Sequence, residues 1–358
     1  MIDIALLRSD PGLVRRTVKQ RGADVDVDRI VEVDAQLRET TARFNTLRTQ
    51  QRRQSMSREQ VDPDAAQAAQ DELRAVTEEV RELQELRDEQ WARVPNLLPP
   101  DTPAGDDDSG NVELRRVGDP VAPDDARRHD AVGTSLGILD PGAAAQVASR
   151  WHGDGARLAW AVFTHAQSVL QARGFTPMLI PPGTREELIG YYGDQVVDAT
   201  RLPIRVSAFS SPQSHAVEQL VLCRPEDSEG WLDECQRNAE EILSDLELPY
   251  RVVRVCVGDL DAPAHKGYHT ECWFPGVGDH RLTHSAANLT DYQARRFRIR
   301  YLERGRVAQP HTLSATGVTE IAIRALLENH LQPAGSVRIP VALRPYLGGQ
   351  ELIEPKPD

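Results

Sequence analysis

Histidine and cysteine side chains that could do chemistry gather between residues 265 and 284. They are His265, His269, Cys272, His280 and His284. Imidazole changes charge near neutral pH, so it can act as a general base or bind a metal ion. Histidines in such places also serve as hydrogen-bonded residues of the fold, so both interpretations stay open. We assign no metal ligand and keep His269 and His284 as candidates for a new activity.

Arginines form a second group with possible chemistry, between residues 38 and 58. They are Arg38, Arg43, Arg48, Arg52, Arg53 and Arg58. Only Glu39 opposes them, whereas residues 71–93 are predominantly acidic. Guanidinium groups bind phosphate well, and a thin arm can follow an RNA backbone by shape. A solvated helix face explains the same charges. RNA binding is therefore a hypothesis, and its candidate residues are Arg43, Arg48, Arg52, Arg53 and Arg58.

The first of two long helices must carry these arginines. Apolar residues recur at alternating three- and four-residue steps in both halves of the segment: Ile30, Val33, Leu37, Phe44 and Leu47, then Leu73, Val76, Val80 and Leu83. This spacing is typical of a coiled coil. We predict an antiparallel two-helix arm with Asp62 and Pro63 near its tip, preceded by a short helix that begins at Asp10-Pro11 and ends at Gly22.

A proline- and aspartate-rich linker separates the arm from the histidines. We predict an arm domain over residues 1–100, a linker over 101–111 and a second domain over 112–358. The second domain mixes expected helices (155–173, 228–246, 319–330) with expected strands (250–257, 269–274, 281–285). Their order is not the regular alternation of a parallel sheet, so we predict an α+β fold with an antiparallel sheet and flanking helices.

Composition limits the function classes. The chain has 358 residues, 40% of them hydrophobic, and a net charge of −13. Such a charge argues against a protein coated in nucleic acid, and we expect no DNA partner. No apolar run is long enough for a membrane span and no signal-peptide core is present, so we expect a cytoplasmic protein. The four cysteines lack CxxC spacing and are expected to be buried thiols.

Several stretches together resemble a bacterial seryl-tRNA synthetase. They are "MIDIALLRSDPGLVRRTVKQRG", "LPYRVVRVCVGDLDAPAHKGYHTECWFP", "NLTDYQARRFRIRY" and "SVRIPVALRPYLGG". The resemblance implies a class II aminoacyl-tRNA synthetase whose coiled-coil arm binds serine tRNA and whose catalytic domain forms a dimer. Residues 153–182 resemble the segment through which such domains pair. The partner could be a second copy or an active seryl-tRNA synthetase.

The departures from the family concentrate in its chemistry. The family's Phe-Arg-x-Glu segment corresponds to a place where Ser210 follows the phenylalanine, and the loop after it is shortened. The serine-binding loop is missing between Gly193 and Leu202. Val221 aligns with the last residue of the family's His-Gln-Phe-x-Lys-Val-Glu pattern, Leu282 with a metal-binding carboxylate, and Ala322 with the phosphate-binding arginine. We therefore expect a cavity without positive charge to bind a nucleotide.

Other positions of the family's serine pocket are retained. They are Lys266, Glu271, Asn288, Thr290 and Thr316. They could bind a ligand or only support the fold. His269 and His284 stand where the family has aspartate and serine. If their strands pair as in the family, both could face one pocket.

The main hypothesis is a paralogue with a degenerate active site, a pseudoenzyme that binds serine tRNA without activating serine. An enzyme repurposed to act on seryl-tRNA or another aminoacyl donor is a second hypothesis. An active serine-tRNA ligase, which would use ATP and Mg²⁺, is a third. We predict no cofactor outside that third hypothesis.

Overall fold

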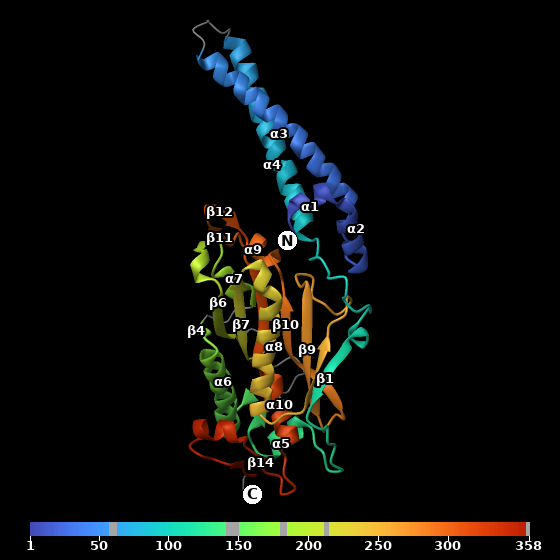
Figure 1. Ribbon diagram of the computed structural model, residues 1–358, viewed down its shortest axis with the longest axis vertical. Helices are drawn as coiled ribbons and strands as arrows, with labels where there is room; N and C mark the ends of the chain where they lie inside the picture. Colours follow the sequence, from blue (N-terminus) through green and yellow to red (C-terminus); the bar gives the residue numbers. More distant parts are fainter. Residues whose placement is uncertain (57–62, 141–149, 180–184, 211–214, 356–358) are drawn as a thin grey trace. The chain divides into compact units, whose positions relative to one another are not determined.

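The computed structural model describes residues 1–56, 63–140, 150–179, 185–210 and 215–355. The chain divides into two compact units, Met1–Leu97 and Leu98–Asp358. Each unit is a body of its own in Figure 1. Among the described residues, no helix combines the length and apolar character that crossing a bilayer requires.

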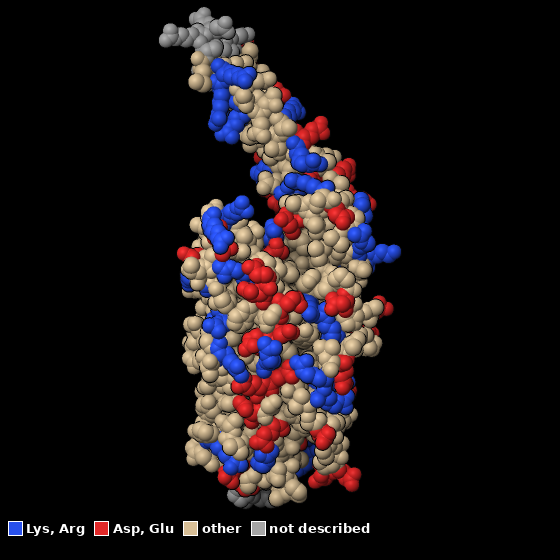
Figure 2. All heavy atoms as spheres, in the orientation of Figure 1, with Lys and Arg blue, Asp and Glu red and all other residues tan. Residues whose placement is uncertain are grey.

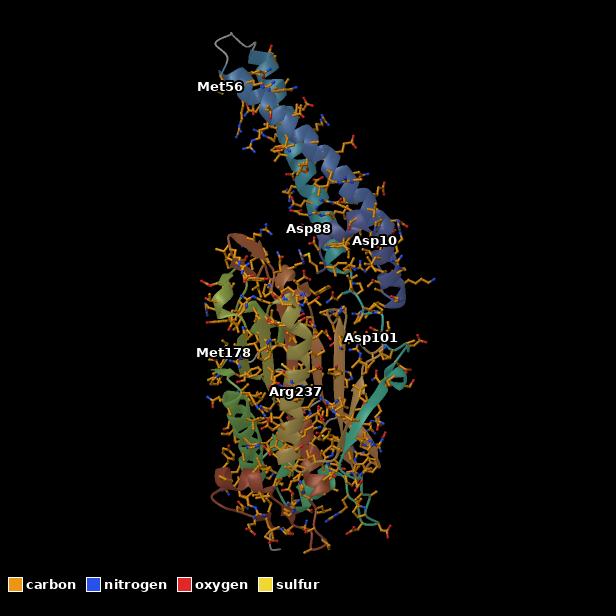
Figure 3. The ribbon with its side chains drawn as sticks, in the orientation of Figure 1. Asp10, Met56, Asp88, Asp101, Met178 and Arg237 are labelled. Atoms are coloured by element: carbon orange, nitrogen blue, oxygen red, sulfur yellow. The ribbon has the colours of Figure 1, made fainter. Side chains whose placement is uncertain are left out.

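The first unit is entirely helical. Its elements are α1 (Ile4–Ser9), α2 (Pro11–Gln20), α3 (Val27–Met56) and α4 (Pro63–Ala92). Asp10 caps α2 by accepting a hydrogen bond from the amide of Leu13, as Asp-Pro at a helix start predicts. Met56 is exposed at the far end of α3 (Figure 3). The expected helix over Asp10 to Gly22 is present.

The two long helices run antiparallel along one seam. Arg43 of α3 pairs with Glu72 of α4. Asp34, nearer the start of α3, lies close to Arg87, nearer the end of α4. Ile30, Val33, Leu37 and Val76 of the predicted seam are buried. The three- and four-residue spacing therefore predicted this arm correctly.

The base of the arm is joined by a buried carboxylate. Asp34, with a side chain only 2% exposed, accepts hydrogen bonds from both Nε and Nη2 of Arg8 at 2.8 Å. Arg38 and Arg87 also lie within 3.5 Å of it. The hydrogen bonds from Arg8 lower the pKa of Asp34, against the opposing effect of burial. Helices α1, α3 and α4 thus share one charged contact.

An eight-stranded sheet forms the centre of the second unit. Its order is β1 (Val112–Val117), β8 (Tyr250–Arg254), β9 (Lys266–Phe274), β10 (Asp279–Asn288), β13 (His311–Thr319), β7 (Ala216–Cys223), β6 (Ile204–Ser210) and β4 (Thr176–Leu179). Every neighbouring pair is antiparallel except β4 and β6. The predicted α+β class with an antiparallel sheet is confirmed.

Helices and small sheets complete this unit. The helices are α5 (His129–Ser135), α6 (Asp154–Ala172), α7 (Arg185–Gly190), α8 (Ser228–Asp245), α9 (Tyr292–Arg296) and α10 (Glu320–Asn329), with 3-10 turns at Asp108–Gly110, Ala199–Arg201, Pro225–Asp227 and Val341–Leu347. Smaller sheets pair β12 (Arg306–Ala308), β11 (Arg300–Glu303) and β5 (Val196–Asp198), then β14 (Val337–Arg338) with β15 (Leu352–Ile353), and β2 (Leu139–Asp140) with β3 (Arg150–Trp151). Acidic side chains gather over α8 in Figure 2.

The two faces of the large sheet have different neighbours. Residues such as Val221 and Cys272 belong to a core formed with α6, α8 and α10. Leu220 and Leu222, which alternate with Val221 along β7, pack instead with residues of α7 and the small sheet. Because successive side chains of a strand point to opposite faces, this alternation decides which residues reach a pocket.

Candidate functional site

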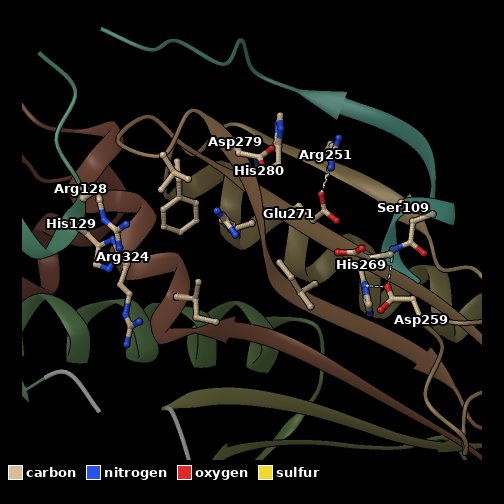
Figure 4. A pocket seen from close by; sticks show the side chains of 17 residues that line it. Ser109, Arg128, His129, Arg251, Asp259, His269, Glu271, Asp279, His280 and Arg324 are labelled. Carbon is tan, nitrogen blue, oxygen red and sulfur yellow. Dashed lines mark hydrogen bonds and ion pairs between the residues drawn. The ribbon is translucent and has the colours of Figure 1, made fainter. Parts of the chain in front are cut away.

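A polar cavity of about 730 Å³ lies against β9 and β10 of the second unit (Figure 4). Its lining includes four arginines, which are Arg128, Arg251, Arg281 and Arg324, and four acids, which are Asp108, Asp259, Glu271 and Asp279. His129, His269 and His280 also line it. The expectation of a cavity without positive charge is therefore wrong. Guanidinium groups at its wall are suited to an anionic ligand.

The cationic groups of the cavity differ in how they are engaged. Arg251 is bound to Glu271 with N–O distances of 2.6 Å. Arg324 of α10 donates to Glu320 at 2.9 Å. Arg281, next to Leu282, also lines the cavity. Arg324 reaches the cavity because it and Ile321 lie one helical turn apart on the same side of α10.

A row of polar side chains crosses four strands beside this cavity. His269 of β9 pairs in register with Ser285 of β10, and Thr316 of β13 with Glu218 of β7. The amide of Ser285 lies 3.5 Å from Thr316 Oγ1, which links the two pairs. The sheet therefore brings together side chains that are far apart in sequence.

Arg185, at the start of α7, closes the Glu218 end of this row. Its Nε donates to Glu218 at 2.7 Å and its Nη1 to the Ser285 hydroxyl at 2.9 Å. Nη2 donates to the hydroxyl of Thr316. Burial raises the pKa of the Glu218 carboxyl, while Arg185 and the hydroxyl of Ser210 lower it. In this closed cluster, Arg185 with Glu218, Ser285, Thr316 and Ser210, the arginine binds the carboxylate and two hydroxyl groups, and Ser210 also binds the carboxylate.

At the other end of the row, His269 pairs with Asp259. Its Nδ1 lies 3.2 Å from Asp259 Oδ2. Both residues line the cavity, and Figure 4 shows the contact as a dashed line. Burial lowers the pKa of His269 below its usual range, and Asp259 opposes this effect. The imidazole is therefore mainly neutral at pH 7.

His284 does not face the same cavity as His269. It pairs with Thr270, whose hydroxyl accepts a hydrogen bond from Gln236 of α8, so it lies on the helix-covered face. Its side chain is buried and its Nδ1 contacts the Thr283 hydroxyl at 2.8 Å. Burial lowers the pKa of His284 to about 3. The hypothesis that both histidines share one pocket is wrong for His284.

Two positions expected at a nucleotide or serine pocket lie in the core instead. Val221 and Ala322 are fully buried among apolar side chains. Leu282 is different, because it lines the cavity and is 46% exposed. It is the cross-strand partner of Glu271. Ser210 ends β6 beside Glu218. Residues 211–215 alone connect β6 to β7, which leaves no room for a long loop there.

The retained polar residues separate into two groups. Glu271 and Thr316 lie on the cavity face, as described above. Lys266 and Asn288 instead bind Glu229 of α8, at 2.6 and 3.0 Å. The backbone amide of Thr290 donates to Asn288 Oδ1. The second group therefore supports the packing of α8 against the sheet.

The donor set at the cavity does not fit a magnesium ion well. Mg²⁺ prefers several oxygen ligands, usually from carboxylates. Here Glu271 is engaged by Arg251, and its cross-strand neighbour is the apolar Leu282. Among the described residues, no three His, Cys, Asp or Glu side chains are grouped so as to hold a metal.

The arm arginines are exposed on α3 where they are described. They are Arg43, Arg48, Arg52 and Arg53, whereas Arg58 lies outside the described residues. Arg43 is engaged by Glu72 of α4, and the guanidinium of Arg48 lies 6.0 Å from the ring centre of Phe44. Of these arginines, Arg43 therefore has an acidic partner on α4.

Two family models cover much of this chain. Residues 1–98 match the seryl-tRNA synthetase N-terminal domain, and residues 177–330 match the tRNA synthetase class II core domain (G, H, P, S and T). The chain belongs to the seryl-tRNA synthetase family. The resemblance seen in the sequence is confirmed at this level.

Curated relatives of this seryl-tRNA synthetase family member align over nearly its whole length. Serine–tRNA ligase of Synechococcus sp. (strain JA-3-3Ab) is 32% identical over 99% of this chain and 98% of its own. That of Deinococcus radiodurans is 31% identical over 99% of both. These alignments span 427 and 421 positions, more than the 358 residues of this chain. The chain therefore lacks residues that its relatives have.

Solved structures of the family share the fold. Seryl-tRNA synthetase from Pyrococcus horikoshii, complexed with ATP, superposes with a TM-score of 0.90 at 28% identity and covers all of both chains. Cytoplasmic serine–tRNA ligase from Naegleria fowleri, in complex with AMP, gives a TM-score of 0.86 at 25% identity, covering 100% of this chain and 99% of its own. The class II fold with an N-terminal helical arm is confirmed.

Sequence comparison with the family missed the central residues of the closed cluster. Arg185 belongs to none of the stretches that carry the resemblance. Glu218, however, has a signal, because Val217-Glu218 repeats the Val-Glu that ends the family's pattern. Glu218 lies on the cavity side of β7, whereas Val221 lies in the core. The glutamate of that pattern is therefore better matched by Glu218 than by Val221.

Proposed function

We propose that this protein binds serine tRNA through its helical arm and does not activate serine. The match of residues 1–98 to the seryl-tRNA synthetase N-terminal domain supports the first part. Exposed arginines of α3, on a chain whose net charge is −13, supply cations for RNA phosphates. Each phosphate contact releases counterions, so binding should weaken as salt rises.

One observation supports the second part above all. The carboxylate of Glu218, which matches the family's serine-hydroxyl position, is already bound by Arg185. A serine entering this cluster would have to displace a guanidinium from a buried carboxylate, Ser285 and Thr316. Breaking this pair leaves a buried carboxylate without its partner and costs about 2–3 kcal/mol, since Arg185 is one third exposed. Leu282 in place of a metal-binding carboxylate acts in the same direction.

The comparisons favour a second candidate, an active serine–tRNA ligase. The relatives that align over the whole chain bear that name, and the Pyrococcus horikoshii enzyme was solved with ATP. The arginines of the cavity also provide positive charge for a polyphosphate. This candidate would use ATP, serine and Mg²⁺, although the carboxylates of the cavity fit the metal poorly.

Serine-dependent ATP–pyrophosphate exchange separates the two candidates. We expect no exchange above background for this chain under conditions in which the Deinococcus radiodurans relative is active. Robust exchange that requires serine would overturn the proposal in favour of the ligase. Because the relative aligns over 99% of this chain, it controls for buffer, metal and nucleotide.

Binding of serine tRNA tests the arm. We expect replacement of Arg48, Arg52 and Arg53 by Ala to weaken binding at least tenfold and to lower its salt dependence. Arg81 on α4, already held by Glu78 and Glu85, offers a matched control, and Arg81→Ala should leave binding nearly unchanged. Equal affinity of the triple variant and the unaltered protein would remove this part of the proposal.

A dimer is also proposed, with a second copy or with an active seryl-tRNA synthetase. Residues of α6 resemble the family's pairing segment, and Trp160 on this helix is 62% exposed beside Phe163 and Phe209. Exposed aromatic side chains of this kind are typical of protein interfaces. Sedimentation of Trp160→Glu would shift toward the monomer. A cytoplasmic location stays a prediction.

A further inference from the structure

The pairing of His269 with Asp259 at the cavity wall has no role in the proposed function. Asp259 lies in the segment after β8, and His269 lies on β9. Their contact joins Nδ1 of the imidazole to a carboxylate oxygen at 3.2 Å. A carboxylate at Nδ1 favours the tautomer with a proton there, which leaves Nε2 as the proton acceptor.

Asp259 is itself held in place. Asn111 Nδ2 donates to Asp259 Oδ2 at 2.7 Å. The Asn111 side-chain oxygen accepts from the backbone amide of Cys256 at 2.8 Å. The imidazole is therefore the last member of a chain of contacts that begins at the main chain. Such support restricts the ring to one orientation, which a proton acceptor in catalysis requires.

Burial favours the neutral form of His269 against most of the charged groups around it. Besides Asp259, the acids Glu271 and Asp261 act on it, and Arg185 acts with the opposite sign. Burial outweighs the acids and lowers the pKa of His269. No hydrogen-bond partner of Nε2 is seen among the described residues, and the side chain keeps 17% of its surface exposed. A neutral imidazole that water can reach is competent as a general base.

We propose that His269 is a general base and Asp259 its positioning residue in the hydrolysis of an aminoacyl ester, such as the one at the 3′ end of a charged serine tRNA. The choice of an RNA-linked ester rests on the proposed binding of serine tRNA. The ester class itself rests on the base and on the polar cavity beside it, whose wall includes arginine side chains that suit developing negative charge.

The reaction needs only water as a second reactant. His269 Nε2 takes a proton from a water molecule while the water oxygen forms a bond to the ester carbonyl carbon. The bond between that carbon and the ribose oxygen then breaks, and the proton on Nε2 passes to the ribose oxygen. The products are a free amino acid and an RNA with a free hydroxyl group. Nothing is oxidised or reduced.

The experiment follows serine release from seryl-tRNA by the full-length protein, with a serine methyl ester as a second probe that does not depend on RNA binding. We expect His269→Ala to lower both rates about 100-fold or more. Added imidazole should restore part of the activity of this variant. Asp259→Asn should lower the rate less, and Asp259→Glu should recover most of it.

His165 and Asp245 provide a matched control. Their side chains form a similar contact, with Nε2 and Oδ2 2.9 Å apart, and neither lines the cavity. His165→Ala should therefore leave both rates unchanged. For the unaltered protein, the rate should rise with pH through a pKa below 6.5 and then level off, because the base acts in its neutral form.

The two proposals can fail separately. One outcome would be hydrolysis of the methyl ester with the same dependence on His269 but no binding of serine tRNA. It would overturn the proposed RNA substrate and support His269 as the general base. Bound seryl-tRNA that is hydrolysed no faster than in buffer, with an inert methyl ester, would overturn this inference. Full activity of His269→Ala, or no rescue of that variant by imidazole, would also overturn it.

Discussion

The row of polar side chains that crosses the sheet has a carboxylate at each end. Glu218 at one end is buried, Asp259 beside His269 at the other end is partly buried, and the two have opposite consequences for the site. Glu218 is bound by Arg185, Ser210 and their neighbours, so the charge is neutralised within the protein. Asp259 contacts a histidine that lines the cavity and whose Nε2 has no hydrogen-bond partner among the described residues. An arginine partner keeps its protons at all relevant pH values, whereas an imidazole can exchange one. The partner, rather than the carboxylate, decides whether the site is closed or reactive.

Removing each carboxylate should expose this difference most strongly. Glu218→Ala leaves the guanidinium of Arg185 without its partner, and we expect the free energy of unfolding to fall by about 2–3 kcal/mol, less than for a fully buried pair because Arg185 is one third exposed. Asp259→Ala should cost about 1 kcal/mol, since His269 can remain neutral. Urea denaturation measures both. Equal losses would contradict the comparison.

The two histidines should differ in how they make stability depend on pH. Buried His284 takes up a proton in the folded state only near pH 3, whereas the unfolded chain does so near 6.5. Stability from this residue is therefore lost as the pH falls from 6.5 toward 3, by at most about 1.4 kcal/mol per unit.

His284→Gln should flatten this slope, which denaturation at pH 6 and pH 5 would measure. His269→Gln should change the slope less, because the ring is partly exposed and Asp259 favours its charged form. A larger effect for His269 would contradict this difference between the two environments.

Removing Arg185 from the closed cluster should produce the smallest effect on stability, through weak binding of serine. Arg185→Ala frees Glu218, Ser285 and Thr316, and we expect weak binding of serine where the unaltered protein shows none. Serine at a concentration equal to its Kd would stabilise the variant by about 0.4 kcal/mol, and more at higher concentration. Thermal unfolding with serine, and with alanine as a ligand that lacks the hydroxyl, measures this. An equal response to alanine would argue against the assignment of Glu218.

Sequence periodicity was enough for the elements but not for the site. The seam of Ile30, Val33 and Leu37 repeats at helical spacing, so the arm could be predicted from local pattern alone. Leu282 and His284 are two residues apart and should share a face of β10. A bulge between them shifts the register, so Leu282 opposes Glu271 while His284 opposes Thr270. Such bulges depend on strand pairing, which no local pattern contains.

The closed cluster could not be predicted for a related reason. Arg185 and Glu218 meet through the packing of α7 on the sheet, 33 residues apart in sequence. Ala322 similarly turned inward, so Ile321 and Arg324 face the cavity. Matching single positions to a family pattern tells which residue type stands at a position, but not which way its side chain points. The direction of a side chain follows from helix phase and strand register, which a shift of one residue changes.

The shared contact at Asp34 has a mechanical consequence for the arm. Three helices meet at one ionised group, so tilting any of them separates an arginine from a carboxylate that is buried. Bending should therefore be suppressed around residues 30–38 and 84–91 and increase along the exposed parts of α3 and α4. Amide hydrogen exchange would record this as slow exchange at the base and faster exchange around residues 45–54. The arm would then become less stiff with distance from Asp34. Asp34→Asn should flatten this gradient.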